Sequence, residues 1–302
     1  MTSIDVWILR FEKTLRDRVT PAIRQFGASY SRLIMLVFLT LFLIGIYISS
    51  QVSGVTFADL CFVPFLGVFF GALVTNTFSA WGLQLIASYS SVHLPFREAI
   101  LVTSFGHLSN LLPIPGSMIV RGGALVTRGA TMKQSATGIT LAGLLWIGMA
   151  GLLSGLSLAI QGESLGWIMI ILCSVVLLIA IWGLALQGNP RLVAAFLLQR
   201  TAMLITMVLR FWLGFRAVNA SASLIECATF VVAGVFGVIV AIVPAGLAVS
   251  EGIAAALASL TVLSPATTFI VVALNRIVGL FSNGIIFTIF ILGRTKKNTK
   301  QN

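Results

Sequence analysis

Long apolar runs alternate with short polar segments along most of this chain. A helix needs about 20 mostly apolar residues to cross the hydrocarbon core of a bilayer, so each long run predicts a membrane span. The six predicted spans are 33–50, 59–88, 136–160, 166–186, 198–218 and 264–292. The pattern therefore predicts an all-α polytopic membrane protein with a single transmembrane domain at 33–292.

Two further apolar stretches, 99–127 and 225–260, are each interrupted near the middle by proline and glycine. The first contains Pro113-Ile114-Pro115-Gly116 and the second Pro244-Ala245-Gly246. Such breaks are tolerated at membrane depth only where the freed backbone groups face protein or a polar cavity. We predict that each stretch is a re-entrant broken hairpin. Two full spans in each stretch are the alternative, and either arrangement leaves the topology of the six spans unchanged.

Composition supports the membrane assignment, and charge orients the chain. Hydrophobic residues make up 58% of the 302 residues and charged residues only 9%, whereas soluble domains contain roughly a quarter charged residues. The 19 Lys and Arg residues outnumber the 8 Asp and Glu residues, which gives a net charge of +11. Fifteen basic residues fall in segment 1–32, in the inner segments (Arg97, Arg128, Lys133, Arg191 and Arg200) or in the tail 293–302, and the predicted outer segments contain none. The positive-inside rule therefore predicts cytoplasmic termini and a multi-pass protein integral to the plasma (inner) membrane.

The basic residues outside the spans form a collar along one membrane surface. Segment 1–32 is expected to be a cytoplasmic basic amphipathic segment, and 293–302 a basic cytoplasmic tail. A collar of this kind favours anionic membrane lipids as partners and does not resemble a nucleic-acid groove.

The sequence repeats itself at an offset of 131, which becomes 130 after a one-residue gap. The informative pairs are Trp81 with Trp212, Phe105-Gly106 with Phe236-Gly237, Pro113 with Pro244, Gly116 with Gly246, and Gly122 with Gly252. Each unit, 59–160 or 198–292, contains a span, a broken hairpin and a span, and the charge distribution orients the two units oppositely. An inverted-topology repeat with matched broken helices is typical of transporters with a site near the midplane. Duplication alone would explain the fold and leave the function open.

Opposite charges occupy equivalent positions in the two broken stretches, Arg121 in the first and Glu251 in the second. A charge near the bilayer centre costs at least roughly 2.5–3.5 kcal/mol, so each is expected to be paired or to line a wet cavity. The hairpin glycines Gly116, Gly122, Gly246 and Gly252 would let the backbones approach closely, with half-helices starting near Ser117 and Leu247. Arg side chains and helix N-termini would together suit an anion such as phosphate. The alternative is a structural Arg121–Glu251 ion pair.

Several other polar residues are candidates for the same site. Arg276, which follows Asn275 in the last span, is expected to line a cavity, with a buried pair to Glu251 as the alternative. His107 and Asn110 precede the first break, where interhelical hydrogen bonding is the alternative to ligand binding. Arg210 lies within a span without an assigned role, and Arg216 is expected to reach the outer headgroups.

Catalysis is not expected. No paired carboxylates lie within one helical turn, and the sequence contains no H-E-x-x-H, P-loop or G-x-S-x-G motif. His93 and His107 are too isolated to indicate a metal cluster or a triad. The sequence therefore predicts no catalytic residue, no metal and no cofactor, although distant residues can assemble an intramembrane site.

Two blocks of the sequence are similar to the membrane region of the lysylphosphatidylglycerol synthase family. The first is Asn110-Leu-Leu-Pro-Ile-Pro-Gly116 with Arg121-Gly122, and the second is Val243-Pro-Ala-Gly-Leu-Ala-Val-Ser-Glu251-Gly252 with Asn275-Arg276. The second block follows the family's P-G-G-L-G-x-R-E-G pattern at Gly246, Leu247, Glu251 and Gly252, and departs from it at Ala245, Ala248 and Ser250. The Glu-Arg pair that the family often has in the next span is replaced here by the uncharged stretch 141–146.

The resemblance implies a flippase-like protein, without a synthase domain, that moves a lipid with a phosphate-bearing headgroup between leaflets. A phospholipid or a polyprenyl-linked lipid would fit, with Arg121 and Arg276 on the phosphate and Glu251 balancing or switching the site. One alternative is a non-transporting membrane partner of lipid-modifying or glycan-assembly enzymes. A second is an intramembrane lipid-modifying enzyme. The lipid, the coupling ion and the oligomeric state are left open.

Overall fold

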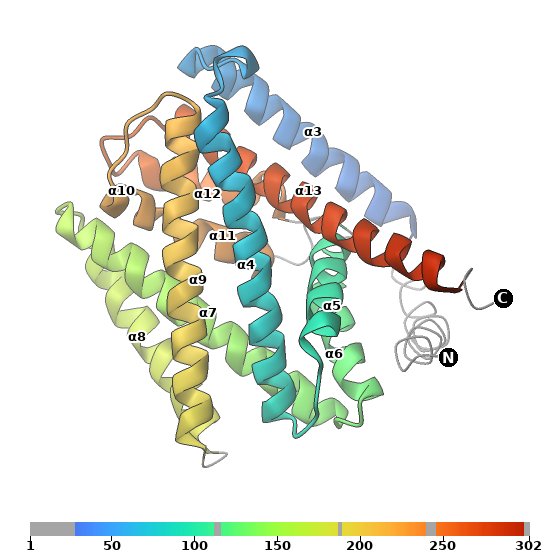
Figure 1. The fold of residues 1–302 in the computed structure, drawn as a ribbon. Coiled ribbons are helices and arrows are strands. Elements are labelled where there is room, and N and C mark those ends of the chain that lie inside the picture. The colour runs from blue at the N-terminus through green and yellow to red at the C-terminus, as the bar shows by residue number, and fades with distance from the viewer. Residues whose placement is uncertain (1–27, 112–115, 187–188, 240–245, 299–302) are drawn as a thin grey trace.

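Long helices dominate the computed structural model, which describes residues 28–111, 116–186, 189–239 and 246–298 (Figure 1). This part of the chain is helical and contains no strand. Six helices are long and apolar enough to cross a membrane, and each coincides with one predicted span. They are α3 (Ala28–Ser53), α4 (Phe62–Tyr89), α7 (Met132–Ile160), α8 (Ser164–Ala185), α9 (Pro190–Ala217) and α13 (Pro265–Asn298). The protein is therefore an integral multi-pass membrane protein, as predicted.

Shorter helices occupy the two interrupted stretches. They are α5 (Phe96–Ser109), α6 (Gly116–Thr127), α10 (Leu224–Thr229), α11 (Val231–Ile239) and α12 (Val249–Ala258), and a 3-10 turn η2 (Phe57–Asp59) precedes α4. None of them has the roughly 20 residues that a span requires. The half-helices expected near Ser117 and Leu247 begin at Gly116 and Val249. Pro113, Pro115 and Pro244 lie outside the described residues, as does most of the predicted amphipathic segment 1–32.

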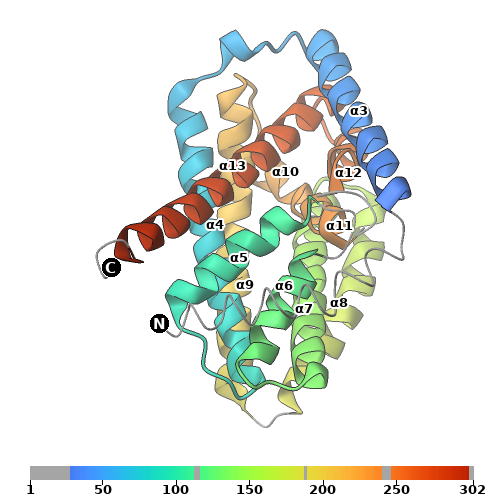
Figure 2. The ribbon, with the colours of Figure 1, turned by 90° about the vertical axis from the view of Figure 1, so that its right-hand side faces the viewer.

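The long helices pack as pairs around α13. Helices α4 and α9 run side by side in opposite directions, and α7 packs along α8 (Figures 1 and 2). Helix α13 crosses this arrangement and contacts α3, α4, α5, α9 and α12 (Figure 2). It thus touches both regions of short helices.

Local sequence signals explain where several helices begin. The Asn189 side chain accepts a hydrogen bond from the Leu192 amide, and Pro190 occupies the first turn of α9. Thr131 and Gln134 form a reciprocal capping box at the start of α7. Helix α9 therefore starts at Pro190, well before the predicted span start at 198, and this shift matters for the site.

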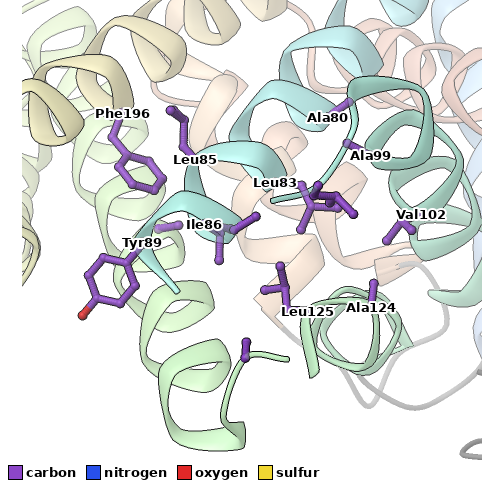
Figure 3. Close-up of a cluster of buried hydrophobic side chains, with 14 of the residues drawn as sticks. Ala80, Leu83, Leu85, Ile86, Tyr89, Ala99, Val102, Ala124, Leu125 and Phe196 are labelled. Carbon is purple, nitrogen blue, oxygen red and sulfur yellow. The ribbon is translucent and has the colours of Figure 1, made fainter. Parts of the chain in front are cut away.

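Apolar packing fixes the short helices of the first stretch. Leu83 and Ile86 of α4 pack with Val102 of α5 and with Ala124 and Leu125 of α6 (Figure 3). A second cluster joins α7 and α9 to α10, α11, α12 and α13. Each broken stretch is thus held in the bundle by its own apolar core.

Small residues and an apolar surface are typical of helices in a bilayer. Gly148 and Gly155 of α7 face α8 so closely that a Cβ added to either would lie 3.0 Å from backbone atoms of Leu177 or Gly166. On its other side α8 exposes large apolar side chains, including Ile171 and Trp182. We infer that this side faces lipid.

Candidate substrate cavity

A cavity of about 560 Å³ lies inside the bundle, and residues of α4, α5, α6, α7, α9, α11, α12 and α13 line it. Its volume is within the range of ordinary small-molecule sites, about 300–1,000 Å³. Of its lining residues, Met118 and Thr140 are exposed, so the cavity reaches the surface at α6 and α7. Four arginines line its wall: Arg121, Arg200, Arg210 and Arg276.

Most of the predicted site residues face this cavity. Arg121 comes from α6, His107 from α5 and Asn275 with Arg276 from α13, while Asn110 follows the last residue of α5. The structure thus brings together residues from both broken stretches. Of the remaining predictions, Gly246 lines the cavity, whereas Glu251, Gly116, Gly122 and Gly252 do not.

Arg121 lines the cavity and has no counter-charge among the residues that the structure describes. Its Nε atom is buried, and no hydrogen bond or ion pair joins the side chain to another described residue. Gly106 of α5 lies against it, because a Cβ added there would sit 3.8 Å from Nε. The guanidinium is therefore available to a ligand.

Glu251 is fully buried and pairs with Arg276. Its Oε1 atom lies 2.9 Å from Nε of Arg276, and Nη2 of Arg276 donates a hydrogen bond to the Ser250 hydroxyl. The alternative pairing of Glu251 with Arg121 is absent among the described residues. Arg276 therefore fits both hypotheses for it, because it lines the cavity and also belongs to a buried ion pair.

The assignment of Arg200 to the inner collar is wrong. It lies ten residues after Pro190, roughly 15 Å along α9, and its guanidinium carbon lies 5.4 Å from the Trp146 ring centroid. Its Nη2 atom donates to the Ala142 carbonyl at 3.0 Å, while its buried Nε atom has no described partner. The Asn189-Pro190 start signal could have placed Arg200 well inside the helix, whereas the predicted span 198–218 left it near the inner end.

Arg210 is a second cavity residue for which the sequence suggested no role. Its Nη2 atom donates to the Asn275 carbonyl at 2.9 Å, and its Nη1 atom donates to the Thr75 hydroxyl at 3.3 Å. Its Nε atom is buried without a described partner. Gly71 of α4 leaves the space in which the side-chain stem lies. By contrast, Arg216 is exposed over the Trp212 ring, which fits the expected headgroup contact.

The asparagines have hydrogen-bond roles inside the protein. The Asn110 side-chain oxygen accepts from the Ser117 amide at 2.8 Å, so it caps α6 across the break. The Asn275 amide nitrogen donates to the Val271 carbonyl at 3.1 Å. Both residues also line the cavity, so their structural and ligand-facing roles coexist.

Only two of the four predicted hairpin glycines are required by close packing. A Cβ on Gly116 would collide with the Ser109 carbonyl, and a Cβ on Gly246 would collide with the Gly237 carbonyl. Gly246 also has a φ of +65°, in the left-handed region. The same requirement is absent at Gly122, where the nearest atom would be 3.6 Å away, and at Gly252, which faces open space. Both are interior residues of regular helices, so no turn demands glycine there.

The cavity carries an excess of positive charge. Glu251 is the one acid paired with a cavity arginine in the described part of the chain, where the other ion pair joins Glu98 to Arg128. Glu226 belongs to the capping box at the start of α10, where its carboxylate accepts hydrogen bonds from the Ser223 amide and hydroxyl. The described residues contain no group of three or more His, Cys, Asp or Glu that could hold a metal ion.

Comparison with known proteins adds no further assignment. No model of a known protein family matches the chain, and no curated protein matches it. The family resemblance of the two sequence blocks therefore stays a prediction.

Proposed function

We propose that the protein is a flippase-like translocase that moves a phosphate-bearing lipid, either a phospholipid or a polyprenyl-linked lipid, between the leaflets of the inner membrane. The observation that supports this most is the cavity of about 560 Å³ lined by four arginines, inside a bundle of six candidate membrane spans. Charged side chains at membrane depth are costly, and they usually mark a substrate pathway. Guanidinium groups bind phosphate through paired N–H donors, so an anionic headgroup suits this wall.

We further propose that α5–α6 and α11–α12 are re-entrant hairpins of an inverted-topology repeat. The end of α4 and the start of α7 lie at one end of the bundle, whereas the end of α9 and the start of α13 lie at the other (Figure 1). This arrangement favours hairpins that enter from opposite membrane faces and meet near the cavity. Inverted repeats of this kind support alternating access around a central site.

In this proposal the charged residues of the cavity have two roles, binding the phosphate and holding Arg276 in place. Arg121, Arg200 and Arg210 contact the phosphate, and Glu251 fixes Arg276 at the edge of the cavity. The surface opening beside Met118 and Thr140 would let acyl or prenyl chains stay in the bilayer while the headgroup occupies the cavity. The collar of basic loops would face the cytoplasm and attract anionic lipid.

Leaflet exchange in reconstituted vesicles tests the function directly. Vesicles containing full-length protein and a fluorescent phosphatidylglycerol or polyprenyl phosphate are treated with a membrane-impermeant quencher. In vesicles with wild-type protein, the fluorescent lipid of the inner leaflet is expected to become accessible to the quencher faster than in protein-free vesicles. Arg121→Gln is expected to slow exchange about 10-fold or more, because a charge-assisted contact to the headgroup is lost.

Arg216→Gln is the matched control, because this arginine is exposed on the same helix as Arg200 and Arg210 and lies outside the cavity lining. It should exchange lipid at the wild-type rate. If wild type accelerates no lipid, the translocase proposal is wrong and the non-transporting partner hypothesis gains weight. That hypothesis predicts loss of function on neutralising the basic residues of segment 1–32, with Arg121 and Glu251 tolerant of substitution.

A further inference from the structure

The cavity arginines differ in how much of their charge is already balanced. Arg276 is neutralised by Glu251 at 2.9 Å. Arg121, Arg200 and Arg210 have no carboxylate partner among the described residues. Three positive charges thus line one cavity, and the described residues supply no carboxylate to balance them.

The same three side chains retain unused hydrogen-bond donors. Each has a buried Nε–H that no described acceptor satisfies, a costly condition that native proteins rarely leave in place without a ligand or water. Arg200 and Arg210 have terminal nitrogens that donate to protein groups, which fixes their orientation. The arrangement therefore combines positioned guanidinium groups with free donors.

These charges lie close enough to interact with each other. Arg121, Arg200 and Arg210 all line one cavity of about 560 Å³, and His107 lines it with them. Like charges held together in a poorly solvated cavity repel one another, so an anion that contacts several of them gains more than one that contacts a single guanidinium. A doubly charged group relieves this repulsion better than a singly charged one.

From this charge balance we infer that the cavity selects a phosphate group carrying two or more negative charges, a terminal phosphomonoester or a diphosphate, held among Arg121, Arg200 and Arg210. This inference rests on the proposed function in taking a lipid as the carrier of the group. It narrows the substrate class, because common phosphodiester headgroups with one net negative charge, and zwitterionic headgroups, would leave part of the charge unbalanced.

Calorimetric titration of full-length protein in detergent tests the preference. The probes are farnesyl diphosphate, farnesyl phosphate, short-chain phosphatidylglycerol, short-chain phosphatidylcholine and farnesol. Farnesyl diphosphate and farnesyl phosphate should bind about 10-fold or more tightly than phosphatidylglycerol, and farnesol should show no saturable binding. Equal affinity for phosphatidylglycerol and the two farnesyl phosphates would overturn the inference.

Variants localise the binding. Arg121→Gln, Arg200→Gln and Arg210→Gln should each weaken farnesyl diphosphate binding about 10- to 100-fold while affecting phosphatidylglycerol less. Arg216→Gln should leave both affinities unchanged. Because a cavity variant can fail to fold, each is first checked for a wild-type thermal transition, and Lys replaces Gln where Gln unfolds the protein. Wild-type affinity in all three folded cavity variants would contradict the assignment.

A pH series gives a readout that a purely structural role would not produce. The second ionisation of a phosphomonoester has a pKa of about 6, so the doubly charged fraction of farnesyl phosphate falls about fourfold between pH 7.5 and 5.5. Its affinity should fall by about the same factor relative to that of phosphatidylglycerol. His107 faces the cavity with the four arginines, and its protonation would act in the opposite direction, so the series is repeated in His107→Gln. A ratio that does not change with pH in that variant would count against a doubly charged ligand.

Binding of inorganic pyrophosphate shows whether the lipid part of the ligand contributes to affinity. Binding of farnesyl diphosphate well above that of pyrophosphate supports a lipid ligand. Equal binding supports the doubly charged site but argues that the ligand is a free phosphate compound, which would count against the translocase proposal. Conversely, leaflet exchange of phosphatidylglycerol without any preference for farnesyl diphosphate would preserve the translocase and overturn this inference.

Discussion

The two broken regions share a plan but differ in how they balance charge. At positions related by the sequence offset, α6 has Arg121 and α12 has Glu251. Glu251 finds its counter-charge in Arg276 of α13, whereas the position equivalent to Arg276 in α7 is Trp146. Trp146 contacts the guanidinium of Arg200 instead. Glu251 is thus neutralised by Arg276 of the last span, whereas Arg121 has no carboxylate partner among the described residues and leaves its charge for the cavity.

A second difference lies in the polar contacts made at two equivalent positions, Glu98 in the first region and Thr229 in the second. In the first, the Glu98 carboxylate at the start of α5 pairs with Arg128, which follows the last residue of α6. In the second, the contact is neutral and reaches another helix, because the hydroxyls of Thr229 in α10 and Ser157 in α7 form a hydrogen bond at 2.7 Å.

The largest expected effect concerns the buried pair of the second region. Glu251→Ala should destabilise the protein by about 3–5 kcal/mol, because it leaves the Arg276 charge buried without its partner. Arg121→Met should instead leave stability unchanged or raise it, since no partner is abandoned. Thermal unfolding of full-length protein in detergent measures both. If both variants destabilised the protein equally, the claim that Glu251 is paired and Arg121 is unpaired would be wrong.

Adding Arg276→Met to Glu251→Ala sharpens the same comparison. The double variant removes both charges and should recover a large part of the lost stability. Failure to recover would show that Glu251 contributes mainly through shape and contacts other than its ion pair.

The next effect concerns the backbone approaches within each region. Gly246→Ala should cost about 1–3 kcal/mol from its left-handed backbone alone, and the collision with the Gly237 carbonyl adds to this. Gly252→Ala should stabilise the protein by about 0.5–1 kcal/mol, since alanine favours the helix and has space. The two unfolding temperatures should therefore move in opposite directions. Similar shifts for both variants would contradict the assigned packing.

A smaller effect is expected for the Glu98–Arg128 pair, which links the start of α5 to the end of α6. Glu98→Gln should cost about 1–2 kcal/mol, because Glu98 is buried while Arg128 is partly exposed and remains hydrated. Raising the salt concentration should narrow the difference between variant and wild type in thermal unfolding. A salt-independent difference would indicate lost packing rather than a lost ion pair.

The smallest effect is expected at the corresponding neutral contact of the second region. Ser157→Ala should cost about 0.5–1.5 kcal/mol, the usual contribution of a neutral hydrogen bond, and this cost should not depend on salt. Thermal unfolding of this variant and of Glu98→Gln compares the neutral contact with the charged one directly. If the destabilisation by Ser157→Ala depended strongly on salt, the distinction between a charged contact in the first region and a neutral one in the second would be wrong.

Much of the fold could be predicted because membrane spans are local features. Each of the six predicted spans overlaps a long apolar helix, and the proline-glycine breaks fall between short helices. The start of α9 was misplaced because the residues around Arg200 are mixed in polarity, while the cap at Asn189 is a weaker signal than an apolar run. Because the predicted start was too late, Arg200 was not predicted as a residue of the candidate site.

The chain's own sequence determined the membrane class, the spans and the positions of the breaks, because hydrophobic run length and proline act over neighbouring residues. It also singled out Arg121, Glu251 and Arg276 as charges that no surface explains. Which of them pair was decided only by tertiary structure, since an ion pair depends on how helices distant in sequence cross. Helix α13 brings Arg276 to Glu251, and α9 brings Arg200 and Arg210 beside Arg121. The balance of charge in the cavity therefore follows from packing.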